Sequence, residues 1–308
     1  SLSIYSDLRA DVKEGVKSEI IFNYNVREEF GEYSEILSGK VKIKYDKNGN
    51  KIRYSSNDFK NRYKYNKNNK ILQNESYNYI DSIYTKKIFE YDSTGNAIKE
   101  ISLDNDELVV SRHEYLYNGN NRKIKELQYS ADSVLVLTCS LNYNKMNSVI
   151  DKSCFSMDGN LKNDRYGISR YIYTYNLQNN LIKEKLYSES GELISSYKIS
   201  YNLDGDMVDR TQYNAKGEIR PDSYGISRYI YSYDENKNLI EERHYNSSGN
   251  LMRRFSNEYN DHHHVISRSE YLEEKEFDED GQSLVSKTVY DYKYKKNYIQ
   301  KFVRFLIF

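Results

Sequence analysis

Three consecutive histidines are the clearest candidate for metal chemistry in this sequence. His262, His263 and His264 could offer two ligands on one side of the chain to zinc or nickel. They follow Tyr259 at a point where related segments of the chain carry Gly or Asn in a turn, and His tolerates the positive φ that such turns need. We therefore expect a variant turn here, with no metal and no cofactor.

Carboxylates are abundant, but their spacing does not predict catalysis or calcium binding. The acidic segments 104–107 and 204–206 lack the twelve-residue loop and the distal bidentate Glu of a calcium site. Many other acidic residues alternate with lysines, as at 183–185, which is typical of the wet face of a strand. No Ser–His–Asp, Cys–His or phosphate-binding Gly motif is present. The sequence therefore predicts no catalytic residues and a protein that is not an enzyme.

A repeated octapeptide is the best candidate for a binding surface. Tyr-Gly-Ile-Ser-Arg-Tyr-Ile-Tyr occurs at residues 166–173 and 224–231, which lie 58 residues apart, and an internal duplication explains the two copies. Tyr and Arg are among the side chains that most often anchor interfaces. We therefore expect a protein or carbohydrate partner at these copies, contacted by Tyr166, Arg170, Tyr171, Tyr224, Arg228 and Tyr229.

The octapeptides lie within a repeat that covers most of the chain. Ten aromatic residues are each followed at once by Asp or Asn and, seven residues after the aromatic, by Ile, Leu or Val; the commonest spacing between them is 26 residues. A second aromatic follows twelve residues after the first in most units. Units this regular must stack on their neighbours. We call the first aromatics the marker aromatics: Tyr45, Tyr65, Tyr91, Tyr117, Tyr143, Tyr175, Tyr201, Tyr233, Tyr259 and Phe277.

Each marker begins a predicted turn between two strands. The Asp or Asn after the marker can accept a hydrogen bond from the backbone two residues on, and the fourth residue after the marker then needs positive φ. Gly or Asn holds that position in eight units, whereas Lys237 and His263 depart from the pattern. Apolar residues alternate before the turns, as in Ile43 and Tyr45, which predicts strands.

The predicted fold is all-β, a single antiparallel meander of about twenty strands. Because adjacent strands twist by roughly 20–25°, such a sheet should coil into a spiral or an open shell. Markers and the aliphatic residues seven positions on should alternate along one edge of one face. Two units are six residues longer, around 162–165 and 220–223, and should carry enlarged loops.

We expect residues 1–40 to form an N-terminal cap with a helix candidate at 8–26, residues 41–284 the repeat array, and residues 285–308 the closing strands.

The turn motif resembles the tyrosine–aspartate (YD) repeat of bacterial RHS proteins. Tyr-Asp-x-x-Gly-Asn occurs at residues 45–50 and 91–96, with a degenerate copy at 201–206, and the resemblance covers about residues 41–284. Second turns such as 187–193 also resemble variant MORN-type hairpin repeats. The resemblance implies a coiled β-sheet that surrounds a toxin or forms an extracellular surface. We expect the fold to carry over without encapsulation, because the chain is too short for a full enclosure.

Composition and cysteine content narrow the class of protein. Lys and Arg number 46, as do Asp and Glu, so the zero net charge gives no basis for a nucleic-acid partner. The sequence contains no apolar run long enough for a transmembrane helix. Cys139 and Cys154 flank one turn. A two-residue loop would place them opposite each other, whereas the three-residue loop predicted here would leave them one residue out of register, so their pairing stays open.

The function expected from these features is a non-enzymatic binding or scaffold module of a bacterium, secreted or at the cell surface. One alternative is an intracellular immunity or antitoxin-type interaction protein, prompted by the MORN-like turns. Another is a fragment of a toxin-enclosing shell. Since the chain begins at Ser1 without Met, we expect an upstream segment that carries an export signal or a lipid anchor.

Overall fold

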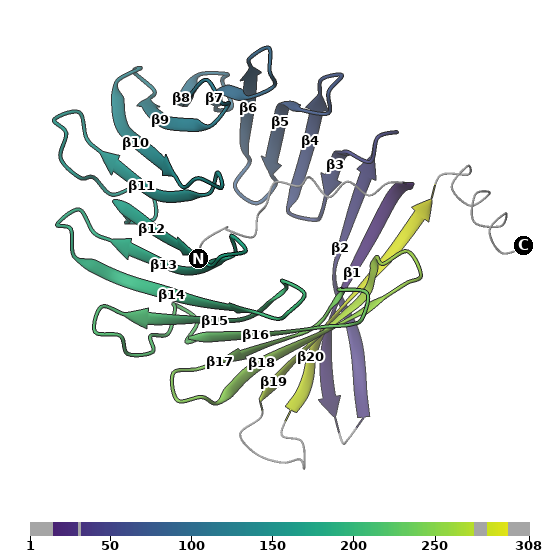
Figure 1. The fold of residues 1–308 in the computed structure, drawn as a ribbon. Helices are drawn as coiled ribbons and strands as arrows, with labels where there is room; N and C mark the ends of the chain where they lie inside the picture. Colours follow the sequence, from purple (N-terminus) through teal and green to yellow (C-terminus); the bar gives the residue numbers. More distant parts are fainter. Residues whose placement is uncertain (1–14, 30–31, 274–281, 295–308) are drawn as a thin grey trace, which may run out of the picture.

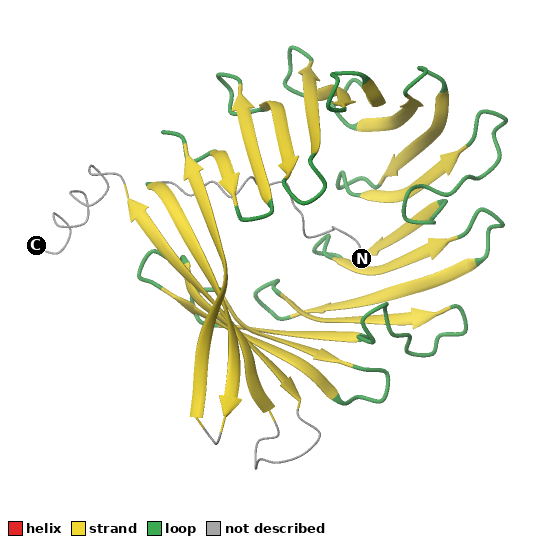
Figure 2. Ribbon diagram, turned by 180° about the vertical axis from the view of Figure 1, so that it is seen from behind, coloured by secondary structure: helices red, strands yellow, loops and turns green. Residues whose placement is uncertain are grey.

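The computed structural model describes residues 15–29, 32–273 and 282–294, and all regular structure in these ranges is β-strand (Figures 1 and 2). Twenty strands follow one another along the chain as an antiparallel meander, which confirms the predicted class and strand number. The helix candidate at 8–26 is wrong from Val16 onward, because that segment belongs to the first strand. The strands are β1 (Val16–Glu29), β2 (Glu32–Tyr45), β3 (Lys51–Ser55), β4 (Phe59–Tyr65), β5 (Ile71–Asn78), β6 (Ile83–Tyr91), β7 (Ala97–Leu103), β8 (Val109–Tyr117), β9 (Lys123–Ser130), β10 (Leu135–Tyr143), β11 (Val149–Phe155), β12 (Arg170–Tyr175), β13 (Leu181–Tyr187), β14 (Leu193–Tyr201), β15 (Met207–Asn214), β16 (Arg228–Tyr233), β17 (Leu239–Tyr245), β18 (Leu251–Tyr259), β19 (Val265–Glu273) and β20 (Gln282–Tyr294).

The sheet closes into a barrel, which corrects the expectation of an open spiral or shell. Every strand pairs with the next along the chain, and β1 pairs with both β2 and β20 (Figure 1). Ile21 lies opposite Val41 of β2 on one side and opposite Tyr290 of β20 on the other. The terminal strands lack the marker motif, yet they bond to each other's free edges. Closure satisfies edge groups that an open sheet would leave exposed.

The marker turns have the predicted backbone. Asp46 accepts hydrogen bonds through Oδ1 from the backbone N–H groups of Asn48 (2.8 Å) and Asn50 (2.9 Å). The fourth residue after the marker has positive φ in each marker turn that the structure describes, from Gly49 (84°) onward. Lys237 (64°) and His263 (58°), which depart from the sequence pattern, adopt the same conformation as Gly and Asn. At Lys237 the turn therefore imposes its backbone on a side chain that disfavours it, whereas His263 tolerates this conformation.

Marker tyrosines join successive hairpins where the backbone ladder stops. The ladder between β7 and β8 ends at Lys99 and Glu114, and beyond it the hydroxyl of Tyr117 donates to the carbonyl of Ala97 at 2.7 Å. The same bond recurs at 2.6–2.9 Å between the last residue of one strand and the first residue of its neighbour. The other donors are Tyr65, Tyr91, Tyr143, Tyr175, Tyr201, Tyr233 and Tyr259, with acceptors Lys51, Ile71, Lys123, Val149, Leu181, Met207 and Leu239 in that order.

We call this series of tyrosine hydroxyl bonds the tyrosine ladder. Where β20, β1 and β2 meet, the tyrosine ladder continues with other partners. Tyr292 of β20 donates to the carbonyl of Val265 at 2.8 Å, and Tyr45 donates to the carboxylate of Glu19 at 2.7 Å. Glu19 is 2% exposed. The aliphatic residues predicted to alternate with the markers stay partly exposed in several units, such as Ile52 and Leu72. An O–H···O bond to the neighbouring strand is the contact that all of the described markers share.

Removing one ladder hydroxyl should lower stability by a measurable step. Tyr117→Phe keeps the ring and deletes the bond to the Ala97 carbonyl, so we expect the free energy of unfolding to fall by about 1 kcal/mol. Chemical denaturation of the variant checks this value. Tyr224→Phe is the matched control, since that ring is 77% exposed. An equal effect of the two substitutions would contradict the role given to the ladder.

Relieving the positive φ at Lys237 should have the opposite effect. Lys237→Gly removes the steric cost of the left-handed conformation, and we expect a gain on the order of 0.5–1 kcal/mol in unfolding free energy. The reciprocal change, Gly205→Lys at the equivalent position, should lose a similar amount. Thermal or chemical denaturation of both variants checks the pair, and a shift of the same sign in both would refute the explanation.

Candidate functional site

A polar pocket of about 610 Å³ lies over β6–β12 and is the candidate site. Its strand residues share one face of the sheet, because cross-strand partners such as Glu100 and His113, or Tyr115 and Glu126, both line it. A single pocket can span seven neighbouring strands only where the sheet curves around it, so this is the inner face of the barrel. Hollows of about 470 and 420 Å³ near β3–β6 are smaller and share Arg62 and Glu75, which point to the outer face.

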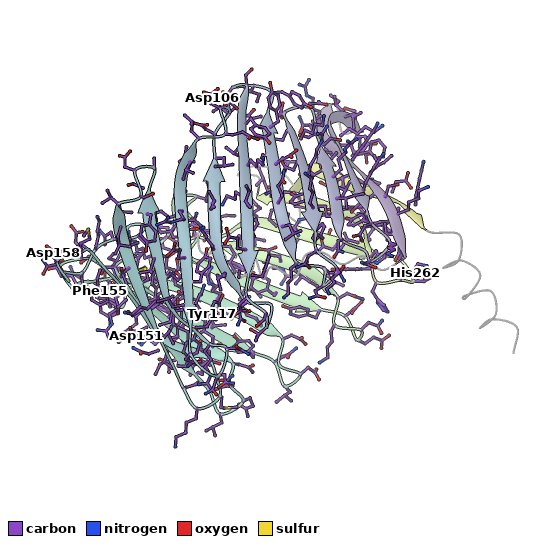
Figure 3. The ribbon with its side chains drawn as sticks, turned by 90° about the horizontal axis from the view of Figure 1, so that it is seen from above. Asp106, Tyr117, Asp151, Phe155, Asp158 and His262 are labelled. Carbon is purple, nitrogen blue, oxygen red and sulfur yellow. A yellow bond between two sulfur atoms is a disulfide. The ribbon has the colours of Figure 1, made fainter. Side chains whose placement is uncertain are left out.

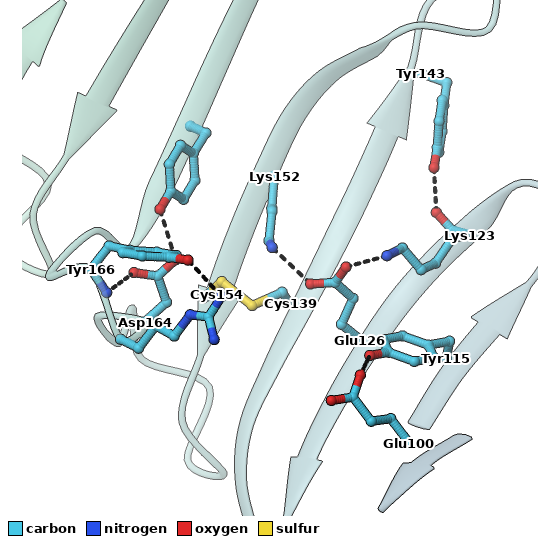
Figure 4. Close-up of polar contacts among 12 residues, drawn as sticks. Glu100, Tyr115, Lys123, Glu126, Cys139, Tyr143, Lys152, Cys154, Asp164 and Tyr166 are labelled. Atoms are coloured by element: carbon cyan, nitrogen blue, oxygen red, sulfur yellow. Dashed lines mark hydrogen bonds and ion pairs between the residues drawn. A yellow bond between two sulfur atoms is a disulfide. The ribbon is translucent and has the colours of Figure 1, made fainter. Parts of the chain in front are cut away.

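The two inner carboxylates of the pocket are paired with lysines, as Figure 4 shows for Glu126. Glu126 of β9 forms ion pairs with Lys123 and, at 2.7 Å, with Lys152 of β11. Burial alone would raise the pKa of Glu126, but the two ammonium groups outweigh it and lower the pKa to about 2. Glu100 of β7 pairs with Lys87 at 2.5 Å. Glu126 is therefore ionised at neutral pH, and each of the two carboxylates has a lysine partner.

Four neutral polar side chains form the floor of the pocket. Ser102 of β7, Ser111 and His113 of β8, and Gln128 of β9 are cross-strand neighbours on the inner face. Burial lowers the pKa of His113, so the imidazole is neutral at pH 7. Within residues 15–29, 32–273 and 282–294, none of the four side chains has a hydrogen-bond partner. The floor thus offers free donors and acceptors to an occupant of the pocket.

The first enlarged loop overhangs this floor. The loop runs between β11 and β12, and Asp164 accepts hydrogen bonds from the backbone N–H of Tyr166 and the hydroxyl of Tyr171, at 2.8 and 2.7 Å (Figure 4). The guanidinium of Arg165 lies 4.7 Å from the centre of the Tyr166 ring and donates to the Tyr166 hydroxyl at 2.5 Å. Asp164, Arg165, Tyr166 and Tyr171 all line the pocket.

The six residues predicted as the partner site do not lie together in the structure. Tyr166 and Tyr171 line the pocket, whereas Tyr224 stands exposed on the second loop. Arg170 is next to Tyr171 in β12 and therefore points to the outer face, where it pairs with Asp151 at 2.5 Å.

Arg228 is placed in the same way as Arg170. It pairs with Asp209, with Nε at 2.7 Å from the carboxylate, and it does not join its neighbour Tyr229 on the inner side. The Tyr229 hydroxyl donates to Asp222 of the second loop at 2.8 Å. The tyrosines of the octapeptides thus orient the two enlarged loops, and the arginines lie on the other face.

The lysine–glutamate pairs and the neutral floor were not predicted from the sequence. One feature of the sequence indicates the lysine–glutamate pairs. A charged residue lies nine residues after a marker tyrosine in four units, at Glu100, Glu126, Lys152 and Glu184. That position falls on the inner face of the returning strand, so a recurring charge there indicates a charged interior. The pairing of Glu126 with Lys152, two strands away on the same face, requires the strand register as well as the sequence.

The histidine segment is a turn, as expected. His263 has a φ of 58°, and its Nδ1 lies 3.2 Å from the amide nitrogen of Asn238 in the preceding marker turn. His262 and His264 donate their backbone N–H groups to Asn260. In the part of the chain that the structure describes, no three His, Cys, Asp or Glu side chains gather as metal ligands would.

Cys139 and Cys154 form a disulfide, with a Cα–Cα distance of 4.0 Å. The loop predicted from sequence left them one residue out of register, but the hairpin contains a register shift beside Tyr143 that restores it. Tyr143 lies opposite Val149, and the next pair, Asn142 with Asp151, skips one residue. Cys139 also lines the pocket, so the disulfide fixes two strands of its wall.

A buried acid, Glu184 of β13, lies beside the pocket. It is 0% exposed and lies opposite Tyr173 of β12 and Tyr197 of β14. Neither carboxyl oxygen has a hydrogen-bond partner among the described residues. Burial raises the pKa of Glu184 to about 7, although Arg210 acts in the opposite direction. The carboxyl group therefore binds its proton near neutral pH.

Replacing Glu184 should change the pH dependence of stability. In the folded state the group titrates near pH 7 instead of 4.5, so the stability it contributes is complete below pH 4.5 and is lost as pH rises to about 7. Glu184→Gln should abolish that loss, on the order of 3 kcal/mol. Urea unfolding at pH 4.5, 6 and 8 measures it, with Glu126→Gln as the contrasting control that loses stability at pH 8. Parallel profiles for wild type and Glu184→Gln would be the contrary result.

Comparison with known proteins gives distant structural similarity only. No family model and no curated protein matches this sequence. The chain is similar to a chain of the Photorhabdus luminescens Tc holotoxin pore carrying a TccC3 mutation, at 9% identity over 80% of this chain, with a TM-score of 0.26. A porin-like protein from Bacteroides uniformis gives 11% identity, 90% coverage and a TM-score of 0.33. A putative outer membrane lipoprotein-sorting protein domain from Vibrio parahaemolyticus gives 9%, 93% and 0.27.

The coverage of these three structures differs. This chain spans 18% of the toxin chain, 97% of the porin-like protein and 91% of the lipoprotein-sorting domain. At these TM-scores the similarities carry no functional argument, and the resemblance to YD repeats stays an expectation from sequence. The described residues contain no helix that is long and apolar enough to span a membrane.

Proposed function

We propose that the protein is a non-enzymatic bacterial binding module that takes a polar ligand into the pocket on the inner face of its barrel. The observation that carries the proposal is the floor of neutral polar side chains without protein partners. Ser102, Ser111, His113 and Gln128 face a volume of about 610 Å³. Polar groups that face a pocket and lack internal partners are available to a ligand.

The walls of the pocket support binding in preference to catalysis. A general acid or base needs a pKa near the working pH, yet the pKa of Glu126 is about 2 because two lysines hold it. Glu100 is likewise paired with Lys87. Salt-bridged side chains keep fixed positions, so the cavity is shaped in advance of ligand binding, which reduces the entropy cost of association.

An extracytoplasmic location, secreted or at the cell surface, forms part of the proposal. The disulfide between Cys139 and Cys154 supports it, since such bonds persist in oxidising compartments and are rare in the cytosol. The same bond argues against the intracellular immunity alternative. The toxin-shell alternative loses support because every strand of the closed barrel has two neighbours, which leaves no sheet edge for further repeats.

The proposal is tested by ligand-dependent stabilisation. Thermal unfolding is measured with a panel of neutral saccharides, acidic saccharides, dipeptides and nucleotides, followed by calorimetry for each compound that raises Tm. Ser111→Phe fills the pocket and should abolish binding. Val110→Phe is the matched control, because Val110 is the neighbouring residue, 47% exposed on the outer face.

Two kinds of outcome distinguish a ligand in the pocket from its absence. Binding by wild type and Val110→Phe, with loss in Ser111→Phe, supports a ligand in the pocket. Absence of binding across the panel, or equal binding by Ser111→Phe, overturns the proposal.

A further inference from the structure

The two enlarged loops share one hydrogen-bonded frame but differ in most of their side chains, including the one that follows the central aspartate. The second loop repeats the frame of the first around Asp222, which accepts hydrogen bonds from the Tyr229 hydroxyl and the Tyr224 backbone N–H, both at 2.8 Å. The residue after the aspartate is Arg165 in the first copy and Ser223 in the second. The frame does not need an arginine, so Arg165 is an addition to a loop that already has its structure.

Arg165 is also the one cation of the pocket lining that no carboxylate pairs. The three lysines of the lining are ion-paired with Glu100 or Glu126. The Arg165 guanidinium instead stacks on Tyr166 and bonds to its hydroxyl. Among the described residues no carboxylate oxygen lies within 4.0 Å of it. Its remaining N–H donors are free to form a bidentate pair with an anion.

The floor below Arg165 suits hydroxyl groups better than apolar side chains. A neutral imidazole at His113, the two serines and the Gln128 amide each combine a donor with an acceptor, as sugar hydroxyls do. Leu137 and the disulfide at Cys139 supply apolar surface to the lining, beside the rings of four tyrosines. The exposed ring of Tyr166, 49% accessible, gives an aromatic face at the mouth.

We propose that the ligand of this pocket is an acidic saccharide whose carboxylate pairs with Arg165, whose ring lies against Tyr166, and whose hydroxyls bond to the Ser102–Ser111–His113–Gln128 floor. This inference rests on the proposed function and names its ligand class. The net excess of one positive charge in the lining matches a single carboxylate per bound sugar unit: the lining holds Lys87, Lys123, Lys152 and Arg165 against Glu100, Glu126 and Asp164.

The experiment compares acidic sugars with their neutral counterparts by calorimetry. Trigalacturonic acid and sialyllactose are each paired with their methyl esters, which lack the negative charge but keep every sugar ring. Wild type should bind the acid of at least one pair about tenfold more tightly than its neutral counterpart. Arg165→Gln should remove that preference, because the acid loses the bidentate pair and the neutral sugar does not. Arg165→Lys should recover only part of it, since an ammonium group cannot form the bidentate pair.

The second loop provides the matched control. Ser223→Gln changes the equivalent position and should alter no affinity. Because Arg165 and Ser223 lie on loop surfaces, both variants should keep the wild-type Tm. Tyr166→Ala should weaken acidic and neutral sugars alike, as expected for stacking.

The results distinguish this inference from the proposed function. Equal affinity for acid and neutral sugar, or an equal loss of both in Arg165→Gln, overturns the acidic-saccharide assignment while pocket binding stands. Binding of dipeptides or nucleotides but of no saccharide also overturns it. Failure of every compound class to bind overturns the proposed function as well.

Discussion

The hydrogen bond from a marker tyrosine to the first carbonyl of the neighbouring strand is the interaction on which the barrel depends. Backbone ladders hold each hairpin together, but between successive hairpins they stop short of the marker turns, as between β7 and β8. At that point the tyrosine hydroxyl takes over the carbonyl that the ladder leaves free. Asp106 and Tyr117 lie toward opposite ends of this stretch of the barrel, so the turn before β8 and the marker at its end belong to different rims (Figure 3).

The same bonds position the pocket. Tyr143 donates to the carbonyl of Lys123, whose ammonium group pairs with Glu126 (Figure 4). The backbone that carries Lys123 is therefore held by the tyrosine bond, and the next strand of the same wall, where Cys139 lies opposite Glu126, is held by the disulfide. The inner face tolerates the charges of Glu100 and Glu126 because each of these carboxylates is paired with a lysine. Glu184, which has no such partner, keeps its proton instead.

Local features of this fold could be predicted from the sequence, because they are set by single residues and their immediate neighbours. The turn at Asp46, the positive φ at Gly49 and the alternation around Tyr45 are such features. Closure could not be predicted, since it depends on strands without the motif, and Ile21 resembles any buried strand residue. The pairing of Cys139 with Cys154 depends on a register shift, and no residue type in the hairpin predicts that shift. Part of the site could be predicted from the sequence, since Tyr166 was identified. The neighbouring Arg165 was not, because adjacency in sequence does not reveal which side chain faces the cavity.

Antiparallel closure restricts how such a molecule can change in size. The two octapeptide copies lie 58 residues apart, and the first strand of one copy, β12, is separated from its counterpart, β16, by four strand steps. Because the meander must return with the correct direction to meet β1, strands can be gained or lost only in even numbers. Duplication of such a segment would add about 19 Å to the circumference, at ~4.8 Å per strand. The interior width therefore evolves in discrete increments, and tandem duplication alone is enough to produce them.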